Sequence, residues 1–159
     1  KYQESASALK SKGGGVLLDL SHEIDYMQYI LGDFSVNYSI NKKISDLEID
    51  TDDYLLIYGE LNKGGLFNIE VSYFSKNERR KIFIEIPNIS IELDIMNSQM
   101  KIVTDHGIEI IQEKKYDLED TYVDQHKAIL SGDFSNNCTL SEGLKTMEII
   151  TGIQNARYQ

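Results

Sequence analysis

The sequence predicts an α+β fold in which one mostly antiparallel, open-faced sheet of six or seven strands carries an N-terminal helix and two C-terminal helices on one face. Three observations lead to this prediction. Apolar residues near the N-terminus recur at three- and four-residue steps, the spacing of one helix face. The middle of the chain changes to short runs rich in β-branched residues, separated by turn residues. Two further helical patterns close the chain, and segregated helices are typical of the α+β class.

The first helix is predicted over residues 16–31. Gly32 follows it as a C-terminal cap, and the three glycines at 13–15 precede it. The residues predicted to face the core are Leu17, Leu20, Ile24, Met27, Ile30 and Leu31.

Seven strands are predicted in the centre of the chain, and the turn residues between them favour hairpins. Their predicted ranges are 34–40, 54–61, 66–74, 81–86, 89–96, 100–104 and 108–112. Strict alternation in several strands predicts one apolar face and one less buried face. Residues 41–53 contain five carboxylates without the spacing of a calcium loop, so we expect a solvated acidic loop there.

Two helices are predicted at the C-terminal end. The first covers about residues 118–130, with Asp117 as N-cap and Gly132 just beyond its end. The second begins with Thr139 and Glu142, which have the spacing of a capping box.

The 159 residues are the length of one domain, which we expect to extend over residues 1–159. The net charge of -10 argues against a nucleic-acid partner, because phosphate binding needs clustered Lys and Arg. A single cysteine and the lack of a long apolar segment predict no disulfide and no membrane association, in a cytoplasmic setting. The start at Lys1 indicates a piece of a longer polypeptide.

Asp19 and His22 are the first candidates for chemistry. Their spacing of three predicts contact on a continuous helix, and a carboxylate beside an imidazole is typical of general acid/base sites. The alternative is a helix-start Asp with a His that hydrogen bonds satisfy. Glu23 and Asp25 are expected on the solvated side. The glycines at 13–15 lack the preceding strand and the spacing of a dinucleotide fingerprint.

Tyr122 and His126 are four residues apart on a predicted helix and therefore share a face that could line a polar cleft. Packing or an exposed surface position is the alternative. His106 lies between Asp105 and Gly107, where it is expected to be a turn residue.

The segment GGGVLLDLSHEIDYMQYILGD, residues 13–33, resembles the start of the C-terminal domain of the Gfo/Idh/MocA oxidoreductases (glucose-fructose oxidoreductase, inositol dehydrogenase and rhizopine-catabolism proteins). Residues 61–95 resemble the strands of that domain with their Gly-rich turn, and residues 116–133 and 138–156 are similar to its two closing helices. The family motif separates its Asp and His by four residues, whereas Asp19 and His22 are three apart.

The resemblance implies a two-domain enzyme that oxidises or reduces a sugar, nucleotide sugar or cyclitol with NAD or NADP. An N-terminal Rossmann domain, absent from this chain, would hold the dinucleotide and supply a catalytic Lys, so this fragment alone is expected to bind no cofactor and to be inactive. His22 would be the general base, and Asp19 would orient it or contact a hydroxyl. Gly13, Gly14 and Gly15 would allow close approach of the substrate.

Tyr122 matches an aromatic position in the closing helices of the family, so Tyr122 and His126 would contact the substrate. The spacing of the carboxylates in residues 41–53 predicts no metal site. The open sheet face would form a homodimer or tetramer interface. The alternative reading is a non-catalytic α+β dimerisation module in which His22 has only a structural role.

Overall fold

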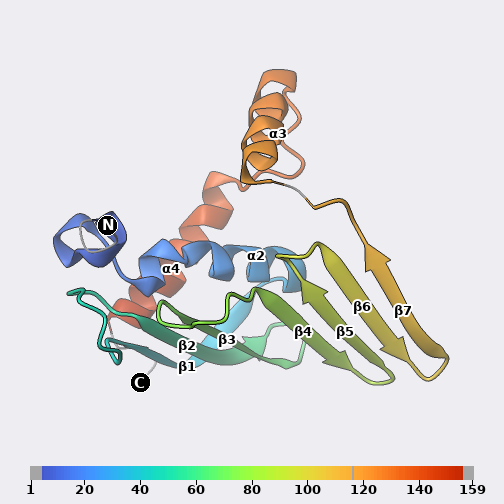
Figure 1. Ribbon diagram of the computed structural model, residues 1–159, viewed down its shortest axis with the longest axis horizontal. Helices are drawn as coiled ribbons and strands as arrows, with labels where there is room; N and C mark the ends of the chain where they lie inside the picture. The colour runs from blue at the N-terminus through green and yellow to red at the C-terminus, as the bar shows by residue number, and fades with distance from the viewer. Residues whose placement is uncertain (1–4, 116, 156–159) are drawn as a thin grey trace. The chain divides into compact units, whose positions relative to one another are not determined.

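The computed structural model describes residues 5–115 and 117–155, and it confirms the α+β class with seven antiparallel strands (Figure 1). The chain divides into two compact units. One unit contains the residues up to Ser75 together with those from Cys138 onward, and the other contains Lys76–Asn137.

The first unit contains a three-stranded sheet and most of the helices. Its elements are two short 3-10 helices at Ala6–Ala8 and Lys10–Lys12, α1 (Val16–Asp19), α2 (Ser21–Leu31), β1 (Phe34–Lys42), β2 (Tyr54–Leu61), β3 (Leu66–Ser72) and α4 (Leu140–Gln154). The strand order is β1-β2-β3.

The second unit contains a four-stranded meander and one helix. Its elements are β4 (Lys81–Ile86), β5 (Ile89–Asp94), β6 (Gln99–Thr104), β7 (Gly107–Gln112) and α3 (Leu118–Ser131). Each strand pairs with the next along the chain, in the order β4-β5-β6-β7.

The strands form two hydrogen-bonded sheets, where the sequence predicted one. The ladder of the first sheet ends at Ser72, although the third strand was predicted to continue to residue 74. The segment 75–80 follows, and it is polar with four charged side chains. Such a segment lacks the alternating apolar residues that a half-buried strand needs, so the pairing stops there.

The helix predicted over residues 16–31 is divided at Leu20. This residue has φ -103° and ψ 25°, which is outside the helical region, and it separates α1 from α2. Its amide donates to the Val16 carbonyl, and the Glu23 amide donates to the Leu20 carbonyl, so the backbone remains satisfied across the break. Residues on the two sides therefore do not follow one helical spacing.

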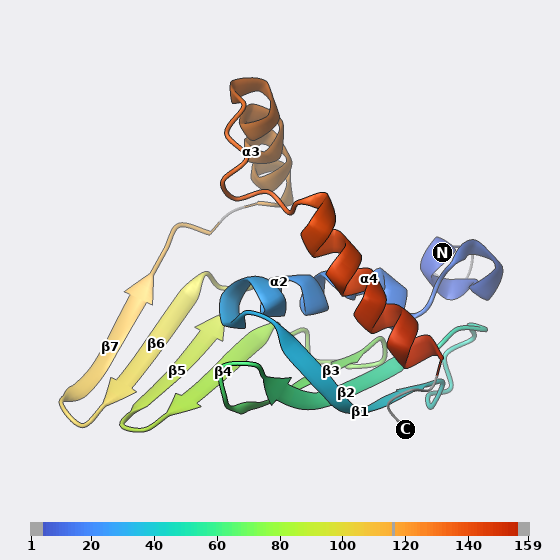
Figure 2. The same cartoon turned by 180° about the vertical axis from the view of Figure 1, so that it is seen from behind.

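The core of the first unit lies between one face of the β1-β2-β3 sheet and the helices α1, α2 and α4 (Figure 2). The buried residues are Val16, Leu17, Ile24, Met27, Val36, Leu55, Ile57, Phe67, Ile69, Ile150 and Ile153. Burial of each such side chain contributes about 1.5–3 kcal/mol. Ile30 was predicted to face the core, but it is 43% exposed, because it lies about 100° around the helix from Leu31.

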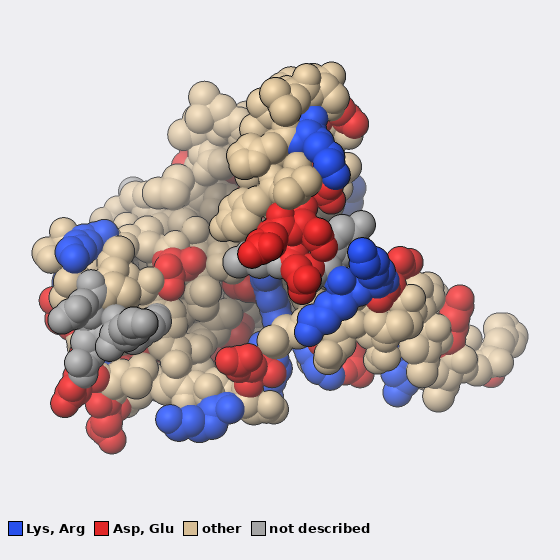
Figure 3. Space-filling view, turned by 45° about the horizontal axis from the view of Figure 1, so that its top comes forward, with Lys and Arg blue, Asp and Glu red and all other residues tan. Residues whose placement is uncertain are grey.

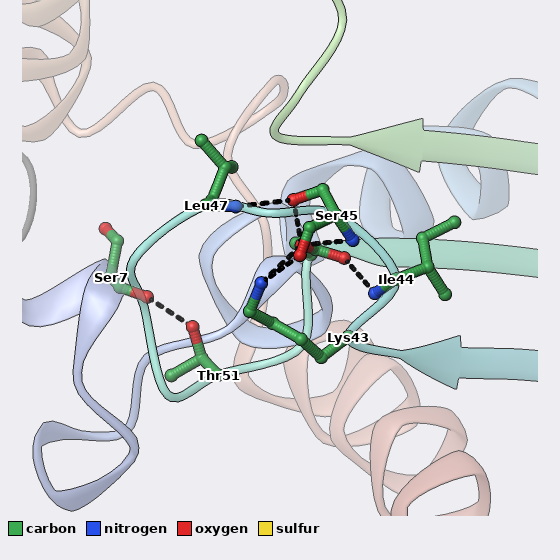
Figure 4. A network of polar contacts seen from close by, with 7 residues as sticks. Ser7, Lys43, Ile44, Ser45, Leu47 and Thr51 are labelled. Atoms are coloured by element: carbon green, nitrogen blue, oxygen red, sulfur yellow. Dashed lines mark hydrogen bonds and ion pairs between the residues drawn. The ribbon is translucent and has the colours of Figure 1, made fainter.

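The acidic segment between β1 and β2 is not solvated throughout, so this expectation is wrong for Asp53. The Asp53 side chain is fully buried and accepts hydrogen bonds from Ile44 N (2.7 Å), Ser45 N (3.1 Å) and the Ser45 hydroxyl, and Lys43 Nζ lies 3.2 Å away (Figure 4). These donors replace water around the carboxylate. Asp53 therefore holds the segment in place.

The predicted caps and turns are confirmed. Asp117 and Asp120 form a capping box at the start of α3, and Thr139 and Glu142 form one at the start of α4. The hairpin turns lie at the predicted positions, and His106 is in the turn between β6 and β7. Positive φ values at Asn88 (68°) and Ser98 (51°) belong to two of these turns.

The surface charges of the described residues are interspersed. On the face shown in Figure 3, Lys and Arg form separate groups beside Asp and Glu rather than one continuous basic surface. In the part of the chain that the structure describes, no helix combines the length and the hydropathy that crossing a bilayer requires.

Candidate active site

Helix α1 begins directly after the three glycines, and groups of the same chain satisfy its first amides. The Gly15 amide donates to the Ser7 carbonyl at 3.0 Å. The Val16 amide donates to the Asp52 carbonyl at 3.0 Å, and the Leu17 amide donates to Asp52 Oδ2 at 3.0 Å. Asp52 thus occupies the place that an anionic ligand would take at a helix start.

The glycines permit close contacts within the chain. A Cβ atom at Gly14 would lie 2.3 Å from the Ala6 carbonyl oxygen, and one at Gly15 would lie 2.3 Å from Asp52 Oδ1. Gly15 also has φ +116°, which L-residues rarely adopt. The packing of this segment therefore accounts for Gly14 and Gly15 without a ligand, and their contact with a substrate stays a prediction.

We expect Gly15→Ala to lower the free energy of unfolding by about 2–3 kcal/mol, because positive φ costs about 1–2 kcal/mol and displacement of the capping carboxylate costs about 1 kcal/mol more. Gly13→Ala is the matched control, since Gly13 has φ +75° and open space around its Cβ position. It should cost about 1 kcal/mol. Urea unfolding of both variants measures the difference, and equal losses would contradict the role of Asp52.

The structure separates the two candidates for acid/base chemistry. Asp19, at the end of α1, is exposed and accepts a hydrogen bond from the Tyr73 hydroxyl at 3.0 Å. His22 lies in the first turn of α2, and its Nε2 atom is 3.3 Å from Glu23 Oε1. Among the described residues, no hydrogen bond or ion pair joins Asp19 to His22. The division of the helix at Leu20 explains why the spacing of three did not produce the contact.

Glu23 is buried, so its expected place on the solvated side is wrong. Only 8% of the residue is exposed, and its carboxylate accepts a hydrogen bond from the Tyr26 hydroxyl and faces His22. The side chain of His22 is 51% exposed. An imidazole with one nitrogen near a buried carboxylate and its other side open to solvent can accept a proton from a hydroxyl group.

Asp25 is half-buried between α2 and α4. Its Oδ1 atom lies 3.5 Å from the Cys138 sulfur and 3.4 Å from the Thr146 hydroxyl, whose single proton is directed to Gln28 Oε1 at 2.8 Å. Desolvation of the sulfur raises the pKa of the Cys138 thiol, and the Asp25 and Glu142 carboxylates raise it further. The thiol is therefore protonated at neutral pH, which argues against a nucleophilic role.

Tyr122 and His126 lie on α3 of the second unit. They share one face of this helix, as predicted, and both are exposed, with Tyr122 exposed by 56%. Their contact with a substrate stays a prediction.

A surface cavity of about 670 Å³ opens in the first unit between α2, the start of β1 and α4. Asp33, Phe34, Lys145 and Met147 are among the residues that line it, and Lys145 Nζ is 2.8 Å from Asp33 Oδ1. None of the predicted site residues lines this cavity.

Sequence reasoning missed two partners of the predicted site. The spacing of three between Glu23 and Tyr26 places them on one helix face, so this pair could have been found from the sequence. Tyr73 reaches Asp19 from a position 54 residues further along the chain. No local pattern predicts that contact.

The class of this domain follows from its match to a protein family. Residues 7–159 match the Gfo/Idh/MocA family, described as "Oxidoreductase family, C-terminal alpha/beta domain", and the chain belongs to this family. No curated protein matches the chain by sequence.

Solved structures share the fold. UDP-N-acetylglucosamine 3-dehydrogenase GnnA from Acidithiobacillus ferrooxidans has a TM-score of 0.72 and 17% identity, over 89% of this chain and 46% of the other. Levoglucosan dehydrogenase, solved with NADH and levoglucosan, has a TM-score of 0.67 and 18% identity, over 80% and 44%. The WlbA dehydrogenase from Bordetella pertussis, solved with NADH and UDP-GlcNAcA, has a TM-score of 0.60 and 16% identity, over 97% and 46%. This chain thus spans less than half the length of each.

Proposed function

We propose that this chain is the substrate-binding and oligomerisation domain of an NAD- or NADP-dependent oxidoreductase acting on a hydroxyl group of a sugar, nucleotide sugar or cyclitol. The observation that carries the proposal is His22, a half-exposed imidazole beside a buried carboxylate, within the segment that resembles the family motif. Neighbours of the same fold carry the names of sugar and nucleotide-sugar dehydrogenases, which supports the substrate class.

The glycine segment of this chain does not fit a dinucleotide, because Asp52 and the Ser7 carbonyl take up the amides at the start of α1. A nicotinamide cofactor would therefore be held by a domain outside this chain, and when bound it accepts or donates hydride. His22 takes the hydroxyl proton in oxidation and returns it in reduction. The isolated fragment has no turnover in this proposal.

The remaining candidates take supporting roles. Asp19 carries an exposed carboxylate whose Oδ2 atom accepts from Tyr73, and it would bind a neighbouring hydroxyl of the substrate. Gly13, Gly14 and Gly15 would line the approach of the substrate to α1. Tyr122 and His126 would contact the substrate from α3.

Turnover of the full-length protein, which contains a dinucleotide-binding domain in this proposal, tests the function. Spectrophotometric assays with NAD and NADP over a panel of sugars, nucleotide sugars and cyclitols should reveal a substrate, and the 159-residue chain should be inactive in parallel. Turnover by the isolated chain, or none by a folded full-length protein over the whole panel, would contradict the proposal.

We also propose that the chain forms a homodimer or tetramer through an open sheet face. On the sheet face opposite to the core of the first unit, Tyr38 pairs with Tyr58, and both are about 40% exposed (43% and 40%). Leu66 on β3 is exposed by 65%. Exposed aromatic and apolar side chains that gather on one face indicate a protein interface.

Light scattering of the chain across the micromolar range should give the mass of a dimer or tetramer, and a monomer throughout would contradict the interface. The alternative function, a non-catalytic dimerisation module, shares this surface. It predicts assembly without turnover of the full-length protein.

A further inference from the structure

We propose that Glu23 is the residue that positions His22, and that it holds the ring with the proton on Nε2 and leaves Nδ1 free to accept a proton. Tyr26 in turn anchors Glu23. The assignment of Nδ1 as the proton acceptor rests on the proposed function, whereas the orientation of the ring does not.

The burial of Glu23 supports this role. A carboxylate in a residue that is only 8% exposed needs donors close by, because removing a charge from water is costly. The Tyr26 hydroxyl donates to Oε2, and His22 Nε2 lies 3.3 Å from Oε1. The two oxygens thus face different partners, so the hydrogen bond from Tyr26 fixes the direction in which Oε1 points.

The position of Asp19 excludes it from the same role. Asp19 belongs to α1, on the other side of the break at Leu20, and its Oδ2 atom accepts from Tyr73 at 3.0 Å. Glu23 belongs to α2 together with His22, so a continuous helix sets the distance between them. Glu23, which follows His22 directly in the chain, therefore takes the orienting role that was expected of Asp19.

The contact determines the tautomer of the neutral imidazole. A lone pair on Nε2 would face the negative Oε1, whereas a proton on Nε2 is attracted to it, so the neutral ring carries its proton on Nε2. The lone pair is then on Nδ1. When Nδ1 takes the proton of a substrate hydroxyl, the resulting imidazolium keeps Nε2 beside the Glu23 carboxylate, which stabilises its charge.

The tautomer can be measured directly by ¹H–¹⁵N NMR of the imidazole rings in the 159-residue chain. The chain contains three histidines, and the signals of His106 and His126 serve as internal references, with His22→Ala identifying the third signal. In the neutral ring, reached by raising the pH until its ¹⁵N signals no longer shift, we expect the Nε2–H form of His22 to dominate. A dominant Nδ1–H form or an equal mixture would overturn the proposal.

Two variants separate Glu23 from Asp19. Glu23→Gln keeps the shape and an acceptor for Tyr26 but removes the charge beside Nε2, so the ratio of Nε2–H to Nδ1–H should fall about 2- to 10-fold. Asp19→Asn should leave the ratio unchanged. An unchanged ratio in Glu23→Gln, or an equal fall in Asp19→Asn, would overturn the proposal.

A third variant decides the matter if Glu23→Gln does not fold. Tyr26→Phe keeps the carboxylate but frees its orientation, and we expect a smaller fall of the ratio. No change in this variant would overturn the anchoring of Glu23. Because the measurement needs neither substrate nor cofactor, a full-length protein without dehydrogenase activity would refute the proposed function and leave the positioning by Glu23 intact.

Discussion

His22→Ala in the full-length protein is expected to lower kcat by about 100-fold or more, because a positioned general base contributes about 10²–10⁴-fold to a proton transfer. The His22 side chain is half-exposed, and its removal takes a contact away from one buried residue, Glu23. The variant should therefore fold. The kinetic loss should appear in kcat with the substrate that the panel identifies, under conditions in which circular dichroism shows an intact fold.

His106→Ala is the matched control for this experiment. His106 is an exposed residue of the turn between β6 and β7, and its amide donates to the Thr104 hydroxyl, a bond that the substitution retains. Its turnover should equal that of the wild type. If kcat survives in His22→Ala, the helix α2 has a structural role and the alternative of a non-catalytic module gains support.

Asp53→Asn should lower the free energy of unfolding by about 3 kcal/mol, because it leaves buried donors and a cation without a full set of partners. Oδ1 of Asp53 accepts from the Ile44 amide, while Oδ2 accepts from Ser45 and lies near Lys43. An asparagine side chain has one oxygen, so its NH2 group would replace the second carboxylate oxygen. This NH2 group would then face hydrogen-bond donors instead of accepting from them. Asp46→Asn, at an exposed position of the same segment, should change stability by less than about 0.5 kcal/mol.

The pH dependence of stability gives a second readout of Asp53. Burial alone would raise the pKa of this carboxyl, but hydrogen bonds from the Ser45 hydroxyl, the Ile44 and Ser45 amides and Lys43 outweigh burial and hold it below its usual range. A lowered folded pKa means that stabilisation is present above the ordinary Asp value of about 3.9 and is lost as the pH falls through the folded value. Asp53→Asn lacks this contribution, so its free energy of unfolding should fall less on acidification than that of the wild type. An acid profile identical to that of the wild type would contradict the lowered pKa of Asp53.

The order of the elements could be predicted because it depends on interactions between near neighbours in the chain. The strands β1, β2 and β4 begin where the predicted runs of β-branched and aromatic residues begin, and the start of α4 follows from the capping box of Thr139 and Glu142. The end of α2 follows from Gly32, whose positive φ of 85° a glycine adopts without strain.

The site could be predicted only in part. His22 was predicted as the general base because the segment GGGVLLDLSHEIDYMQYILGD is a local pattern, but its contact with Glu23 was not predicted. The expected contact with Asp19 assumed one continuous helix, and the break at Leu20 removed that geometry. A break of this kind depends on how both helix segments pack into the core, and the helical spacing of residues 16–31 contains no signal for it.

The sequence by itself determined the class, the element order, the caps and the candidate imidazole, since each rests on spacing or on residues within a few positions of one another. Only the tertiary structure decided which carboxylate faces His22, why Gly15 must be glycine and why Asp53 is buried. Gly15 meets Asp52 from 37 residues away, and Tyr73 reaches Asp19 across 54 residues. Contacts between distant segments arise from the packing of the whole core, so the local sequence pattern does not specify them.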